Sequence, residues 1–304
     1  MTPRRIPSTD LQVSPLCLGT MTFGTPVGEA EAIPIVHRAL EMGVNFIDTA
    51  NMYEGYTRQV GSRGEVSEAI LGEALRDRRE RAVLATKVGM KIGPSPDDGG
   101  LSRAHVLREC DRSLDRLQTD WIDLYYMHTT DPDTPLEESI GAFMDLIEAG
   151  KVRYWGISNY DADQTREVLE ACDANNWQRP AAHQPPYSLL KRDIEKDLLP
   201  LCRAEEIAVV PYQVLQGGLL TGKYRDASSP PEGSRGKEQP GWIPLLSDPA
   251  AQKEIADLTE QASEQGLSLF DYTIRTTVET PGITSIILGV KDAGQIEAAV
   301  RALE

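Results

Sequence analysis

Six short apolar runs in this sequence end at polar side chains that could bind a substrate or exchange a proton with it. The side chains are Asp48, Lys87, His128, the pair Ser158 and Asn159, Gln184, and Tyr212. If each run is a buried parallel strand, a closed barrel would bring all of these ends to one rim. That rim is where the loops from strand to helix build active sites, so the spacing predicts a single site.

Four residues in this set could together reduce a carbonyl group. Hydride addition leaves an alkoxide that needs a proton, and Tyr53 is a usable acid although a free tyrosine has a pKa near 10. The Lys87 ammonium is expected to lower that pKa, Asp48 to hold Lys87, and His128 to orient the substrate oxygen. Taken singly, Asp48 and Lys87 read as a buried ion pair, Tyr53 as a rim aromatic and His128 as a core histidine.

The elements that would position these residues alternate along the chain. Strands are expected at 16–18, 44–47, 82–86, 122–127, 152–157, 180–183, 207–211 and 285–288. Helices are expected at 29–42, 65–79, 102–117, 135–149, 161–175, 193–206, 249–265 and 292–302. This regular alternation of strand and helix is typical of a parallel α/β fold.

Eight strands favour a (β/α)8 TIM barrel over an open doubly wound sheet. No Gly-x-Gly-x-x-Gly turn follows the first strand, which argues against a Rossmann fold. Segments 4–6 and 11–13 suggest a β-hairpin that closes the barrel bottom. Long loops at 54–63, 88–100 and 213–246 would lie on the active rim, and 228–241 is a candidate mobile clasp. We expect residues 1–304 to form one domain.

Composition narrows the partners of the protein. The formal charge of −16 disfavours binding to nucleic acid or to an anionic membrane. No apolar stretch approaches bilayer length, so a cytoplasmic location is expected. The four cysteines show no metal-ligand spacing, which predicts reduced structural thiols and no metal site.

The chain resembles the aldo-keto reductase superfamily through an ordered set of motifs. They are Leu18–Gly24, Asp48–Tyr53, Thr86-Lys87, Asp123-Leu124-Tyr125 with His128, Gly156–Asn159, and Leu219–Tyr224. The resemblance implies a (β/α)8 barrel with Asp48, Tyr53, Lys87 and His128 as the catalytic tetrad. It also implies an NADP(H)-dependent oxidoreductase acting on a small carbonyl or alcohol substrate.

The same resemblance implies a set of cofactor-binding residues. Ser158, Asn159 and Gln184 would hold the nicotinamide carboxamide, and Tyr212 would stack on the ring. Lys291, at the start of the last helix, could contact an adenosine 2′-phosphate, which favours NADP(H) without excluding NAD(H). The remaining candidates are Gly19, Thr20, Met21, Asp48, Gln213, Val214, Leu215, Gln216, Gly217, Lys223, Arg235, Gly289 and Gln295.

The sequence departs from the family pattern where the adenine would bind. Gln295 is followed by Ala298 and Ala299, where many members carry Glu and Asn. These alanines cannot make the polar contacts, which predicts weaker cofactor binding or an adenine held by other residues.

Two other functions remain open. One is a cofactor-binding regulatory subunit with slow turnover, similar to the potassium-channel β subunits. The other is a phosphosugar isomerase or aldolase on the same barrel. Oligomeric state, substrate identity and reaction direction stay open.

Overall fold

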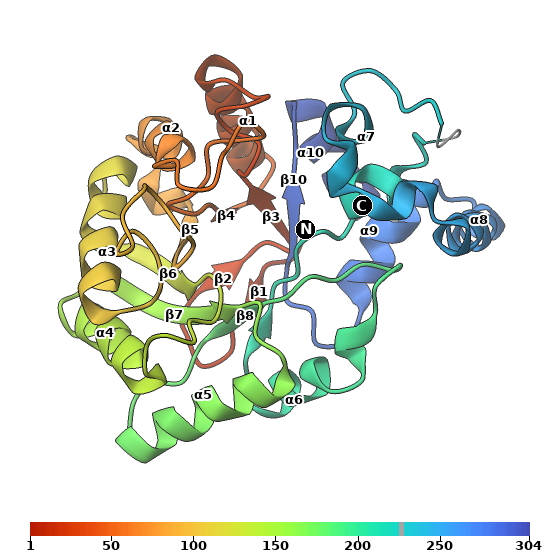
Figure 1. Cartoon of the computed structure of the whole chain (residues 1–304). Coiled ribbons are helices and arrows are strands. Elements are labelled where there is room, and N and C mark those ends of the chain that lie inside the picture. Colours follow the sequence, from red (N-terminus) through yellow and green to blue (C-terminus); the bar gives the residue numbers. More distant parts are fainter. Residues whose placement is uncertain (225–227) are drawn as a thin grey trace.

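An eight-stranded parallel sheet forms the centre of the computed structural model, which describes residues 1–224 and 228–304 (Figure 1). Its strands lie in the order β10-β3-β4-β5-β6-β7-β8-β9. Their bounds are β3 Leu16–Gly19, β4 Phe46–Asp48, β5 Val83–Val88, β6 Ile122–Met127, β7 Val152–Ser158, β8 Ala182–Gln184, β9 Ala208–Val209 and β10 Ile286–Gly289.

The sheet closes on itself between its two end strands. The Thr284 amide donates to the Val209 carbonyl at 2.8 Å, and the Ile287 amide donates to the Pro211 carbonyl at 2.9 Å. These bonds join the β10 segment to the β9 segment, which confirms the expected (β/α)8 barrel.

Side chains alternate between the barrel interior and the surrounding helices. One buried cluster fills the interior and includes Cys17, Phe46, Ala85, Leu124, Tyr126, Ala182, Val210 and Ile287. The site residues face the same side as the interior residues, because each is separated by an even number of positions from an interior residue of the same strand segment. They are Gly19, Asp48, Lys87, His128, Ser158, Gln184, Tyr212 and Gly289.

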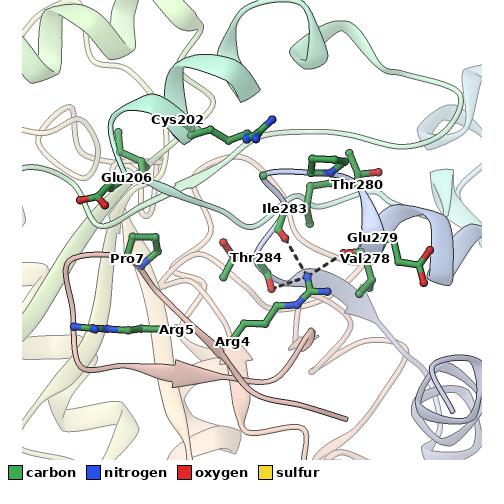
Figure 2. A pocket seen from close by; sticks show the side chains of 14 residues that line it. Arg4, Arg5, Pro7, Cys202, Glu206, Val278, Glu279, Thr280, Ile283 and Thr284 are labelled. Carbon is green, nitrogen blue, oxygen red and sulfur yellow. Dashed lines mark hydrogen bonds between the residues drawn. The ribbon is translucent and has the colours of Figure 1, made fainter.

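A two-stranded hairpin covers the other end of the barrel, as expected. It pairs β1 (Arg4–Arg5) with β2 (Gln12–Val13), and its buried side chains join the interior cluster. Figure 2 shows how Arg4 fastens the hairpin: its guanidinium donates to the carbonyls of Val278, Ile283 and Thr284. The connection into β10 is thereby held against the N-terminus.

Ten helices are found in the described ranges. They are α1 Glu29–Glu41, α2 Val66–Leu75, α3 Arg103–Leu117, α4 Leu136–Glu148, α5 Ala162–Asn175, α6 Leu198–Ala204, α7 Arg235–Glu238, α8 Pro249–Glu264, α9 Leu269–Glu279 and α10 Ala293–Ala302. In the described chain, none combines the length and apolar character needed to cross a bilayer.

Two helix predictions need correction. The helix expected at 193–206 is a short 3₁₀ turn at Asp193–Glu195 followed by α6. Helix α9 was not predicted, although it buries Leu269, Ile274 and Val278. Helix α8 buries only two alanines and lies at the periphery of the molecule (Figure 1), so α9 supplies the apolar face that packs inward.

The three long loops lie on the rim opposite the hairpin. The third, at 213–246, contains η3 (Gln216–Thr221), α7 and two further 3₁₀ turns, at Pro240–Trp242 and Pro244–Ser247. Residues 225–227 of this loop lie outside the described residues. The segment proposed as a clasp therefore includes a short helix.

Candidate active site

The Lys87 ammonium is the centre of the site, and all three of its hydrogens have acceptors. Its Nζ lies 2.5 Å from Asp48 Oδ1, 2.7 Å from the Thr49 carbonyl and 3.2 Å from the Tyr53 hydroxyl. Lys87 is fully buried at the end of β5, next to β4, which ends at Asp48. The three acceptors hold the Lys87 ammonium in one position, within hydrogen-bond distance of the Tyr53 oxygen.

The arrangement fixes where the Tyr53 proton can go. Because Lys87 donates to the Tyr53 oxygen, the hydroxyl hydrogen of Tyr53 is free to point elsewhere. Tyr53 and His128 both line the open cleft, and their rings meet edge to face with centroids 5.9 Å apart. A substrate oxygen between these two side chains could therefore receive a proton from Tyr53.

The pKa values of these groups follow from burial. Burial raises the pKa of Tyr53 above 10.0, and although the Lys87 charge lowers that pKa as expected, its effect does not outweigh burial. Burial would lower the pKa of Lys87, but Asp48 and Tyr53 outweigh it and raise that pKa. Burial, Lys87 and Arg58 hold the pKa of His128 well below 6.5. At neutral pH the site therefore contains a protonated tyrosine, a charged lysine and a neutral histidine.

A second set of hydrogen bonds ties the neighbouring strand ends to this centre. Gln184 Nε2 donates to Asp48 Oδ2 at 2.8 Å, and the Ser158 hydroxyl donates to the Gln184 carbonyl at 2.8 Å. Asn159 Nδ2 donates to the His128 carbonyl at 2.7 Å, while its Oδ1 accepts from the Tyr212 hydroxyl at 2.6 Å. Asn159 Nδ2 also donates to the Ser158 hydroxyl oxygen at 3.1 Å, so the three amide and hydroxyl residues expected to bind a carboxamide form one connected network.

These groups open into a cleft of about 900 Å³, within the range of roughly 300–1,000 Å³ typical of ligand sites. Lys87 lies beneath its floor, and Gln216 is the one cofactor candidate that does not line it. Lining candidates are Gly19, Thr20, Met21, Asp48, Tyr53, His128, Ser158, Asn159, Gln184, Tyr212, Gln213, Val214, Leu215, Gly217, Lys223, Arg235, Gly289, Lys291 and Gln295.

Positive side chains gather at the part of the cleft formed by η3, α7 and the end of β10. Burial lowers the pKa of Lys223, and the charges of Lys291 and Arg235 lower it further. Gly218 has a φ of +99°, and a Cβ there would lie 2.6 Å from Lys223 Nζ. An anionic group with several oxygens suits this cluster, although the whole chain is acidic.

The two alanines near the far end of the cleft differ in position. Ala298 lines the cleft, whereas Ala299 is fully buried in the core. Gln295 bonds to its own helix start, since its Oε1 accepts from the Lys291 amide and its Nε2 donates to Asp292.

Several cleft residues were not predicted. Met52 lies just before the first long loop and Met90 lies in the second, and Tyr56 and Trp242 meet edge to face with ring centroids 5.4 Å apart. Arg58 joins these loops by donating to the Met52 and Lys91 carbonyls. For Tyr56, Met90 and Trp242 loop length was the sequence signal, because single apolar loop residues carry no periodic pattern.

Comparison with known proteins gives one family along nearly the whole chain. The family model described as "Aldo/keto reductase family" matches residues 15–304. An "Uncharacterized oxidoreductase YrpG" of Bacillus subtilis (strain 168) is 34% identical, over 97% of this chain and 89% of that protein. A "Probable voltage-gated potassium channel subunit beta" of Arabidopsis thaliana is 32% identical, over 97% and 88%. An "L-glyceraldehyde 3-phosphate reductase" of Escherichia coli (strain K12) is 31% identical, over 88% and 78%.

Proposed function

The chain belongs to the aldo/keto reductase family, and from this premise we propose that it is an NADP(H)-dependent oxidoreductase. It reduces an aldehyde or ketone to an alcohol, or oxidises an alcohol or sugar in the reverse direction. The observation that carries the proposal is the Lys87 ammonium, which donates to Asp48, Thr49 and the Tyr53 hydroxyl at the floor of the cleft.

The residues of the chain divide the work of reduction. Tyr53 donates its proton to the substrate oxygen, and the charged Lys87 stabilises the phenolate that remains. Asp48 keeps Lys87 charged and in place, and neutral His128 orients the carbonyl oxygen. A nicotinamide bound in this cleft would supply a hydride, two electrons with one hydrogen, for the carbonyl carbon.

The cleft has groups that fit such a cofactor. Tyr212 offers an aromatic face whose hydroxyl is fixed by Asn159, and Ser158 and Gln184 lie beside it. Lys223, Arg235 and Lys291 would hold the phosphates. Gly217 and Gly218 both have positive φ, and without side chains they would let the backbone approach the phosphates closely. Three cations favour NADP(H) over NAD(H), since NADP(H) carries the additional phosphate.

The proposal is tested by Tyr53→Phe in an assay of NADPH oxidation with a panel of aldehydes and ketones. We expect kcat to fall by about 100-fold or more, because the proton donor is lost. Binding of NADPH should change by less than about twofold, since the ring remains.

The matched control is Tyr154→Phe, whose hydroxyl bonds to Asp10 at the hairpin end of the barrel. This variant should keep wild-type turnover. Wild-type turnover in Tyr53→Phe would remove Tyr53 as the acid.

A second candidate is a cofactor-binding regulatory subunit with slow turnover. It is favoured by relatives whose names describe probable potassium channel β subunits, at 32% identity over 97% of this chain. Cofactor release slower than any carbonyl turnover, together with a stable protein partner, would favour this function. The family match gives no support to a phosphosugar isomerase or aldolase.

A further inference from the structure

The ammonium group of Lys291 already has two hydrogen-bond partners among the described residues, and both belong to the long loop after β9. It also lies 5.2 Å from the centre of the Tyr56 ring. Its Nζ donates to the Gly233 carbonyl at 2.7 Å and forms an ion pair with the Glu238 carboxylate. Lys291 lines the cleft at the end of β10, whereas Glu238 is the last residue of α7. The ion pair therefore joins two sides of the cofactor cleft.

Two further positive side chains lie near this pair. Lys223 and Arg235 line the same part of the cleft, and Glu238 is the acidic group whose charge acts on Lys223. The Glu238 side chain is 33% exposed and that of Lys291 is 23% exposed. Both are thus partly shielded from water, where charge interactions are stronger than at an open surface.

A phosphate and the Glu238 carboxylate would compete for the same ammonium. A phosphate bound to Lys291 must displace Glu238 or lie beside its negative charge, and either arrangement weakens phosphate binding. A dinucleotide without the adenosine 2′-phosphate has no such requirement. The competition would therefore reduce the affinity for NADP(H) and leave the affinity for NAD(H) nearly unchanged.

We propose that Glu238 is a specificity-determining residue that serves as an internal counter-ion of Lys291 and reduces the preference for NADP(H) over NAD(H). The inference rests on the proposed function, because it assumes that a nicotinamide dinucleotide occupies this cleft. Neither the residue type of Glu238 nor its position in the loop after β9 had suggested this role.

Fluorescence titration of the purified protein with NADPH and with NADH tests this role by measuring Kd rather than turnover. Glu238→Gln should tighten NADPH binding by about three- to tenfold, and NADH binding should change by less than about twofold. Lys291→Met should weaken NADPH binding selectively. Adding Glu238→Gln to Lys291→Met should have a smaller effect on NADPH binding than Glu238→Gln alone, because the counter-ion acts mainly through Lys291.

The matched control is Glu232→Gln, which removes an exposed carboxylate from the same loop. Glu232 pairs with Lys237 at 3.3 Å and its side chain is 85% exposed. An equal gain in NADPH affinity from Glu232→Gln would mean that net charge alone is responsible, and would overturn the role of Glu238.

Two outcomes separate this inference from the proposed function. If wild-type protein binds both cofactors and Glu238→Gln leaves the ratio of the two Kd values unchanged, the inference fails and the proposed function stands. If wild-type protein binds neither cofactor, both fail together.

Discussion

Burial decides the protonation states on which the proposed chemistry depends. Tyr53 has to carry its proton until the substrate oxygen takes it, and burial raises its pKa above 10.0. The pKa of Lys87 also lies above its ordinary value of 10.5, so its charge persists over the same range. His128 stays neutral because its pKa lies well below 6.5. The site is therefore set for proton donation across the neutral range.

A pH profile of carbonyl reduction checks these assignments. We expect kcat to be nearly constant from about pH 7 to pH 9, since the pKa values of Tyr53 and Lys87 lie above this range and that of His128 lies below it. A proton donor acts below its pKa, so the rate should fall only above pH 10, where Tyr53 loses its proton. A midpoint between pH 7 and pH 9 that is retained in single-turnover measurements would contradict this account of Tyr53.

Helix α2 connects the candidate site to the helical layer. The Ser67 amide donates to the Tyr53 carbonyl at 3.0 Å, and its hydroxyl donates to Thr20 Oγ1 at 2.8 Å and accepts from Thr49 Oγ1 at 3.0 Å. Thr49 supplies the carbonyl that holds Lys87. The position of α2 thus affects both the candidate acid and the group behind it.

The packing of α2 against α3 depends on Gly72. A Cβ at Gly72 would lie 2.2 Å from the Arg116 carbonyl oxygen, which requires the two helices to separate. Gly72→Ala should therefore lower the free energy of unfolding by about 1–3 kcal/mol, as measured by denaturant titration.

Gly141→Ala in α4 is the matched control, because its Cβ would meet only the Trp177 ring at 3.9 Å. There the better helix propensity of alanine should stabilise the protein by about 0.5–1 kcal/mol. Similar changes in both variants would contradict the packing argument.

Local patterns were sufficient for most elements and failed where the chain departs from strict alternation. Asp161 begins α5 with a capping box that includes Gln164, a signal visible in the sequence. Helix α9 carries a similar signal, since Ser268 accepts from the Asp271 amide, but the pattern at 249–265 was assigned as the last helix before β10. An additional peripheral helix cannot be recognised by counting one helix after each strand, because its local sequence pattern resembles that of the other helices.

For the whole molecule, the alternation of side chains along each strand predicted that the polar strand ends lie on one rim. The hydrogen-bond and ion-pair partners of the site residues could not be predicted from the sequence. The bond from Gln184 to Asp48 joins residues far apart in the chain, and Glu238 reaches Lys291 only through the path of the long loop. The cleft is therefore lined by residues that lie far apart in the chain. Its positive cluster could not be predicted from composition alone, because the whole protein has a net charge of −16.

Titration of the wild-type protein with NADPH and NADH, followed by fluorescence, measures whether a nicotinamide dinucleotide binds in the cleft. We expect saturable binding of NADPH at one site per chain, with weaker binding of NADH. Saturable binding would support the assignment of Tyr212, Lys223, Arg235 and Lys291 to a dinucleotide cleft. If neither cofactor binds, the cleft does not serve nicotinamide chemistry, and the loss of polar contacts at Ala298 would mark a cofactor site that no longer functions.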